Sequence, residues 1–103
     1  MKNLVMIVHT NAQQGLADLL RGLEQIQGFT FSHAEGHGIH SERDSFLSAR
    51  DRVVGYTPQA RVDILLEDGD VDSVLAAIRA DRGVVIDQGF FWVTPVEMQG
   101  HLD

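Results

Sequence analysis

Apolar and polar positions follow the same order twice along the chain: an extended run, a helical stretch and a second extended run. The first run, residues 4–8, is short, apolar and rich in valine and isoleucine, which predicts a buried strand. From Asn11 apolar residues recur every three or four positions as far as Ile26, and Gly28 closes the pattern. Asn11 and Gln14 have the spacing of a capping box, so one amphipathic helix is expected up to Gly28.

Residues 29–36 predict a second strand that runs into a loop. Extended backbone places alternate side chains on one face, and that face would carry Phe29, Phe31, His33, Glu35 and His37. The second half of the chain repeats the scheme, with a strand over 61–67, a helix over 71–82 and a last strand over 84–93 that is interrupted at 87–89.

Two βαβ units in tandem predict an α+β fold, a ferredoxin-like βαββαβ sandwich with an antiparallel sheet and both helices on one face. A short extended tail follows Pro95, which cannot donate a ladder hydrogen bond. We expect a single domain over residues 1–103. One layer of helices leaves Phe90 and Trp92 uncovered, so a homo-oligomer is expected.

Residues 38–60 show no periodic pattern, and such a connection is longer than the roughly 12–15 residues of ordinary loops. We expect a flexible loop with a functional role. Within it, Phe46 and Leu47 lie between acidic and basic residues, which is typical of a solvated segment with a nascent helix or of a partner-docking surface. Tyr56 is a further candidate partner-docking residue in this loop.

Composition argues against several classes of protein. Hydrophobic residues make up 44% of the chain, as in globular proteins, and the net charge of −7 without a basic cluster argues against nucleic-acid binding. The absence of cysteine removes thiol nucleophiles and thiolate metal sites. The apolar run at 4–8 is too short for a secretory signal, and no segment is long enough to insert into a membrane, so a cytoplasmic protein is expected.

The sequence Gly36-His37-Gly38 at the base of the loop, together with the run from Phe91 to Glu97, resembles the PII-like signalling proteins, the superfamily of nitrogen regulatory PII and CutA. More specifically, it resembles a PII-like branch often encoded beside heavy-metal efflux systems. The resemblance implies a homotrimer whose long loop, the T-loop, contacts a small effector and a partner such as a membrane transport protein.

The chain departs from the PII pattern where that family binds ATP. PII proteins have a glutamine two residues after the Gly-x-Gly and a lysine after the glycine of the later loop, and this chain has His40 and Phe90 there. Glu97 and His101 stand toward the end, where PII proteins have basic residues. Orthodox ATP binding is therefore not favoured. An alternative is a non-standard effector or nucleotide cleft between subunits, formed by Gly36, Gly38, Gln88 and Gly89.

His33, His37 and His40, with Glu35 between them, form the densest group of metal-ligand side chains. Neutral imidazole suits zinc, copper and nickel, and a carboxylate can complete the shell. Alternate residues on a strand lie ~7 Å apart, so chelation requires a bend, which glycines permit. The alternative interpretation is a set of solvated polar residues at a strand end.

The leading hypothesis is a trimeric PII-like regulator that senses a small effector, a divalent transition metal, and signals through its loop to a heavy-metal efflux transporter. One alternative is a CutA-like metal-tolerance protein that does not signal, and another is an adenine-nucleotide-binding regulator. The sequence contains no Walker-type loop and no Gly-x-Ser-x-Gly elbow, and an enzyme is not expected.

Overall fold

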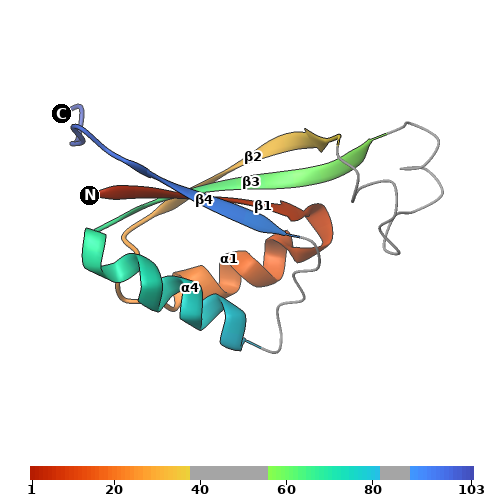
Figure 1. Cartoon of the computed structure of the whole chain (residues 1–103), viewed down its shortest axis with the longest axis horizontal. Coiled ribbons are helices and arrows are strands. Elements are labelled where there is room, and N and C mark those ends of the chain that lie inside the picture. Colours follow the sequence, from red (N-terminus) through yellow and green to blue (C-terminus); the bar gives the residue numbers. More distant parts are fainter. Residues whose placement is uncertain (38–55, 82–88) are drawn as a thin grey trace.

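The computed structural model describes residues 1–37, 56–81 and 89–103. A four-stranded antiparallel sheet in the order β2-β3-β1-β4 carries both helices on one face (Figure 1). The elements are β1 (Lys2–His9), α1 (Gln13–Arg21), β2 (Phe29–Gly36), β3 (Thr57–Leu66), α4 (Val71–Ala80) and β4 (Phe90–Pro95), with short 3-10 turns at Thr10–Ala12 and Asp68–Asp70. The predicted ferredoxin-like α+β fold is confirmed.

The hydrophobic core lies between the sheet and the two helices. Its buried members come from alternate positions of β1 and β3 and from the inner faces of α1 and α4: Leu4, Met6, Val8, Ala60, Val62, Ile64, Leu66, Leu16, Leu20, Val74, Leu75 and Ile78. Phe29 and Phe31 of β2 pack against this cluster, with ring centroids 5.7 Å apart. The face of β2 that the alternation predicted to be apolar is therefore the helix face.

Helix α1 is shorter than the predicted helix and ends at Arg21 instead of continuing to Gly28. Gly22, a poor helix former, is its C-cap. The Leu23 amide then donates to the Leu20 carbonyl at 3.2 Å, and the Ile26 amide donates to the Leu23 carbonyl at 3.1 Å. These three-residue turns keep Leu23 and Ile26 against the core, which explains why the apolar spacing continues beyond the helix.

The start of α1 also differs from the prediction, because no capping box forms. The side chain of His9 accepts the Asn11 amide at its Nδ1 atom, at 3.1 Å, and a 3-10 turn precedes the helix. Gln14 donates instead to Asp18, at 3.0 Å. The inserted turn places Asn11 one step before the true N-cap, which is Ala12.

Strand β3 begins at Thr57, four positions before the predicted start at residue 61. Its first residues pair with the end of β2, Gly36 opposite Thr57 and Glu35 opposite Pro58. Residues 57–60, predicted as loop, are therefore strand. Pro58 and the polar Gln59 interrupt the run of apolar residues typical of a strand, so the sequence did not predict a strand here.

In the last third of the chain, α4 ends at Ala80, two residues before the predicted end. The predicted strand segment at 84–86 lies outside the described residues. Strand β4 lies at the edge of the sheet beside β1, as Pro95 predicted, and the ladder ends there. In the described ranges, no helix combines the length and the apolarity required to cross a bilayer.

Candidate functional site

The loop base is the end of the β2–β3 ladder, where the chain leaves the sheet toward residue 38. There β2 and β3 extend beyond the two helices (Figure 1). His33 and Glu35 continue the helix-facing row of β2 but lie past the part that the core covers, so both are exposed. The alternation that packs Phe31 against the core thus presents polar side chains two and four residues later.

Two of the predicted ligand residues are in direct contact at the loop base. His37 Nε2 lies 3.2 Å from Glu35 Oε2, and both side chains are nearly two-thirds exposed. The ring of His37 also lies 5.9 Å from the ring of Tyr56, on the other side of the loop. A shallow hollow of about 360 Å³ adjoins them, lined by His33, Ala34, Glu35, Tyr56, Pro58 and Gln59.

This donor set fits a metal ion only in part. Within the described ranges, no three histidine or carboxylate side chains stand close enough together to bind one ion. Glu35 and His37 offer an adjacent oxygen and nitrogen, which suit zinc, copper or nickel. A third protein ligand would have to come from elsewhere; His40, the remaining predicted ligand, lies outside the described residues.

The four residues predicted to form an effector cleft are distributed over both edges of the sheet. Gly36 ends β2 at one edge, and Gly89 directly precedes β4 at the other, both at the end of the sheet where β1 ends. Three strand spacings, about 14 Å, separate these edges. The two glycines of one chain therefore do not lie side by side, and the predicted cleft between subunits would combine glycines from two copies of the chain. Gly38 and Gln88 lie outside the described residues.

Gly36 has a structural reason to be glycine that the sequence did not reveal. A Cβ atom at this position would lie 2.5 Å from the Cδ atom of Gln59, so the Gln59 side chain packs directly on the Gly36 backbone. Next to it, the Thr57 side chain is buried, and its hydroxyl has no hydrogen-bond partner among the described residues. Gln59 and Thr57 were missed because isolated polar residues at a strand end carry no sequence signal.

Of the predicted docking residues, Tyr56 is placed at the loop base against His37. Phe46 and Leu47 lie outside the described residues.

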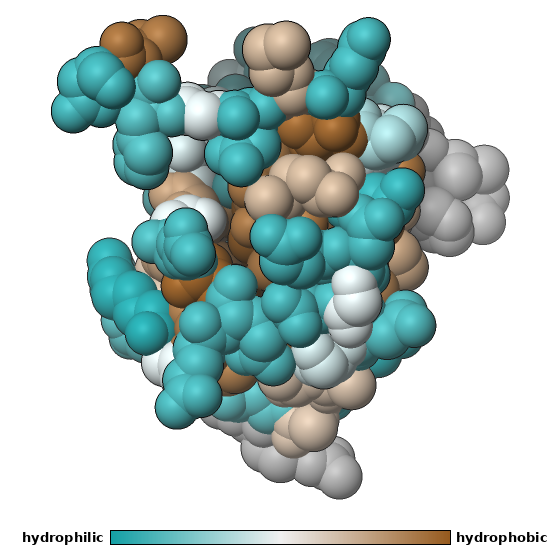
Figure 2. All heavy atoms as spheres, turned by 90° about the vertical axis from the view of Figure 1, so that its left-hand side faces the viewer, coloured by the Kyte–Doolittle hydropathy of each residue, from teal (hydrophilic) through white to brown (hydrophobic). Residues whose placement is uncertain are grey.

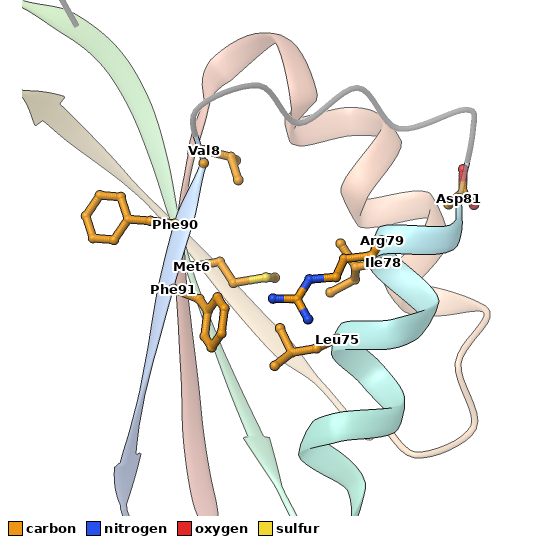
Figure 3. Close-up of a pocket in the computed structure, with 9 residues that line it drawn as sticks. Met6, Val8, Leu75, Ile78, Arg79, Asp81, Phe90 and Phe91 are labelled. Carbon is orange, nitrogen blue, oxygen red and sulfur yellow. The ribbon is translucent and has the colours of Figure 1, made fainter. Parts of the chain in front are cut away.

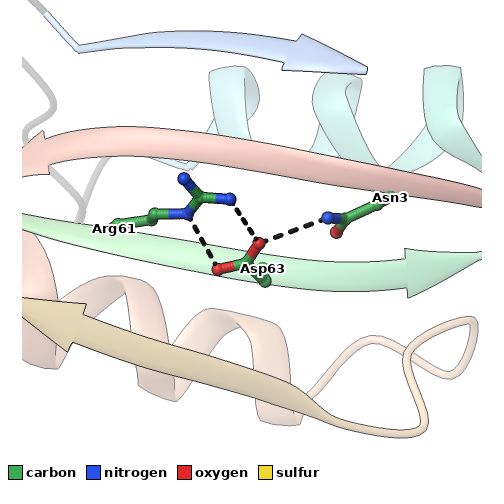
Figure 4. A network of polar contacts seen from close by, with 3 residues as sticks. All are labelled: Asn3, Arg61 and Asp63. Atoms are coloured by element: carbon green, nitrogen blue, oxygen red, sulfur yellow. Dashed lines mark hydrogen bonds and ion pairs between the residues drawn. The ribbon is translucent and has the colours of Figure 1, made fainter. Parts of the chain in front are cut away.

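The face of the sheet opposite the helices, here called the outer face, carries a polar network (Figure 4). Arg61 Nε and one terminal nitrogen donate to the two carboxylate oxygens of Asp63 at 3.1 and 3.0 Å, and Asn3 donates to Asp63 at 3.2 Å. The hydrogen bond from Arg61 lowers the pKa of Asp63 below its usual value, and partial burial opposes this shift. Asp63 in turn raises the pKa of Arg61.

Aromatic side chains of β4 lie beside this network. The Arg61 guanidinium reaches across β1 to the Trp92 ring, 5.6 Å from its centroid, and Phe90 lies 5.7 Å from Trp92. Beneath them Val5 and Ile7 are buried, although both helices lie on the opposite side of the sheet. Phe90 and Trp92 themselves remain 57% and 37% exposed, as the sequence predicted for a single chain.

The end of the molecule that carries both termini has a mainly hydrophilic surface (Figure 2). Figure 2 shows hydrophilic side chains over most of that end, with apolar surface only in separate small areas. The exposed aromatic residues of β4 are therefore the stronger candidate for an interface.

Comparisons with known proteins agree with this fold. The nitrogen regulatory protein P-II of Azospirillum brasilense is 31% identical over 74 residues, which make up 70% of this chain and 65% of that protein. The match thus spans less than two thirds of P-II. The crystal structure of a DUF3240 family protein from Shewanella baltica OS155 superposes with a TM-score of 0.73 at 18% identity, covering 99% of this chain and 96% of that one.

These similarities support the assignment of the chain to the PII-like superfamily. More specifically, the family model described as "Protein of unknown function (DUF3240)" matches residues 1–103, and the chain belongs to that family.

Proposed function

We propose that this chain is a homotrimeric PII-like regulator that binds a divalent transition metal at the loop base. In this proposal the metal changes the conformation of the 38–55 segment, and that segment contacts a membrane transport protein, such as a heavy-metal efflux transporter, from the cytoplasm. The observation that carries the proposal is the contact between His37 and Glu35 beside Tyr56, where the chain leaves the sheet.

The position of this pair supports a sensor better than a simple metal store. Glu35 ends the helix-facing row of β2, so the core strands hold its backbone, whereas His37 follows the last ladder residue. A metal bound by both side chains joins the fixed sheet to the beginning of the loop. Signalling follows only if the metal binds one loop conformation more tightly than another, because a ligand with equal affinity for both conformations shifts nothing.

In the proposed trimer, the outer face of the sheet forms the contact between copies of the chain. Phe90 and Trp92 are exposed there, and a second copy of the chain would cover them. A trimer would also bring the β2 edge of one copy near the β4 edge of another, which the shared glycine cleft requires.

Isothermal titration with zinc, copper(II) and nickel tests the metal site. Replacing Glu35→Gln and His37→Ala together should weaken binding by more than about tenfold, because both donors are lost. Binding should also weaken on acidification, because imidazole binds a metal only in its neutral form. The matched control, Glu97→Gln with His101→Ala, removes the same residue types from the exposed tail and should retain binding. Equal affinity in both double variants would remove the site assignment.

Two further measurements separate this proposal from its alternatives. Limited proteolysis within residues 38–55, with and without metal, distinguishes a signalling loop from a CutA-like metal store: protection by metal supports signalling. A thermal-shift screen with ATP, ADP and AMP tests the nucleotide alternative, which predicts stabilisation without metal.

A further inference from the structure

A second hollow lies at the opposite edge of the sheet from the loop base, between α4 and the strands β1 and β4 (Figure 3). Its volume is about 470 Å³, within the range of pockets that hold small molecules. Its walls are mainly apolar, with Met6 and Val8 from β1, Leu75 and Ile78 from α4, and Phe91 from β4. These five side chains face one another across the gap that separates the helix from the edge strand.

One cation enters this apolar hollow. The Arg79 guanidinium extends from α4 toward β4 and lies 5.5 Å from the centroid of the Phe91 ring (Figure 3). In the part of the chain that the structure describes, no carboxylate forms an ion pair with Arg79, whereas Arg61 and Arg21 are paired with Asp63 and Asp18. Asp81 stands at the rim near the end of α4, on the far side of Arg79 from Phe91.

We infer that this hollow binds a small amphipathic carboxylate. The apolar tail would lie among Met6, Leu75 and Ile78, and the carboxylate would accept hydrogen bonds from Arg79, whose planar guanidinium suits bidentate recognition of carboxylates. A tail in this position removes apolar surface from water, and the head supplies an anion for Arg79, which no carboxylate of the described residues provides.

The lining favours this ligand class over two others. A nucleotide polyphosphate carries several negative charges, and the described lining offers a single cation. A neutral apolar molecule would contact the walls but would not use the guanidinium of Arg79, which is exposed at the hollow (Figure 3). The hollow is separate from the proposed metal site, because β4 and β2 form opposite edges of the sheet.

Octanoate and its neutral analogue octanamide are suitable probes. With methyl-labelled protein, octanoate should shift the methyl resonances of Met6, Val8, Leu75 and Ile78 and leave those near the loop base unchanged. Octanamide should bind about tenfold more weakly, because it loses the charge-assisted hydrogen bonds. Equal affinity for the two probes, shifts confined to other methyl groups, or no saturable binding of octanoate would each overturn the inference.

Variants of arginine on the two helices sharpen the test. Arg79→Gln should reduce octanoate affinity about tenfold and leave octanamide affinity unchanged, because only the charged contact is lost. Arg79→Lys, which keeps the charge, should restore part of the affinity. Arg21→Gln removes a similarly exposed arginine from the end of α1 and is the matched control. Loss of octanoate binding in Arg21→Gln to the same extent as in Arg79→Gln would contradict the assignment to this hollow.

Discussion

The two faces of the central sheet are covered in different ways. On the helix face, alternate residues of β1 and β3 are buried under the apolar sides of α1 and α4, all supplied by one chain. On the outer face, the buried Val5 and Ile7 lie opposite Trp92 and Arg61 of the neighbouring strands. In the described part of the chain no helix covers this face (Figure 1), and the aromatic residues Phe90 and Trp92 stay exposed. Over β1 and β3 the helix face is covered within one chain, whereas the outer face is suited to contact with another copy.

Two adjacent residues of β3 should show this difference most strongly. Ile64 is fully buried on the helix face, and Leu65, next to it, is 46% exposed on the outer face. Ile64→Ala should lower the free energy of unfolding by about 2–5 kcal/mol, because it removes buried methyl groups and leaves a cavity. Leu65→Ala should change it by at most about 0.5 kcal/mol in dilute solution. Urea unfolding of both variants at low protein concentration measures the contrast, and similar losses would contradict it.

Association should depend on Trp92. Trp92→Ala removes the largest aromatic side chain of the outer face, and its loss from an interface should weaken self-association by about 30-fold or more. Sedimentation velocity over a range of concentrations measures the effect. Leu102→Ala, a change in the fully exposed tail, is the control and should leave the assembly intact. An unchanged assembly in Trp92→Ala would place the interface elsewhere.

Close packing at the loop end of the outer face should appear as coupling between Gly36 and Gln59. Gly36→Ala should cost about 1 kcal/mol, because the new methyl group meets the Gln59 side chain and displaces it. In a Gln59→Ala background the same substitution should cost much less, since the obstructing atoms are gone. A double-mutant cycle by thermal unfolding measures the coupling, and additive effects would show that the two residues do not interact.

The smallest expected effect concerns the ion pair of Arg61 and Asp63. Because the folded-state pKa of Asp63 is lowered, the pair stabilises the protein at neutral pH, and this contribution is lost as the pH falls through the usual carboxyl range and below. Water screens this partly exposed pair, so Asp63→Asn should cost only about 0.5 kcal/mol at pH 7. The variant and the parent should converge in stability at acidic pH; a constant difference would assign the effect to something other than ionisation.

The fold could be predicted from the sequence because the apolar periodicity that defines each element also buries it. The order of the elements in the described ranges, the helix-facing row of Phe29 and Phe31, and the exposed aromatic residues of β4 all followed from spacing. The errors fall at element ends, where periodicity does not separate one turn type from another. Leu23 and Ile26 keep helical spacing in successive three-residue turns, and His9 accepts the Asn11 amide where an asparagine cap was expected.

The candidate site was less predictable. Strand alternation placed Glu35 and His37 on one side, and their contact depends on how the backbone turns after Gly36. The partner of that turn, Gln59, and the neighbouring Tyr56 come from the other side of the loop, so only the pairing register of β2 with β3 brings them together. The hollow beside Arg79, between α4 and the strands β1 and β4, likewise depends on how α4 packs on the sheet, which residue spacing does not encode.

Native mass spectrometry of the chain incubated with zinc, copper, nickel and adenine nucleotides tests the central claim most directly. The account predicts a trimer that carries metal ions in multiples of three and loses them when Glu35→Gln and His37→Ala are combined. A trimer that carries nucleotide in place of metal, or that carries no ligand, would contradict the loop-base site, and a monomer would contradict the assignment of the outer face.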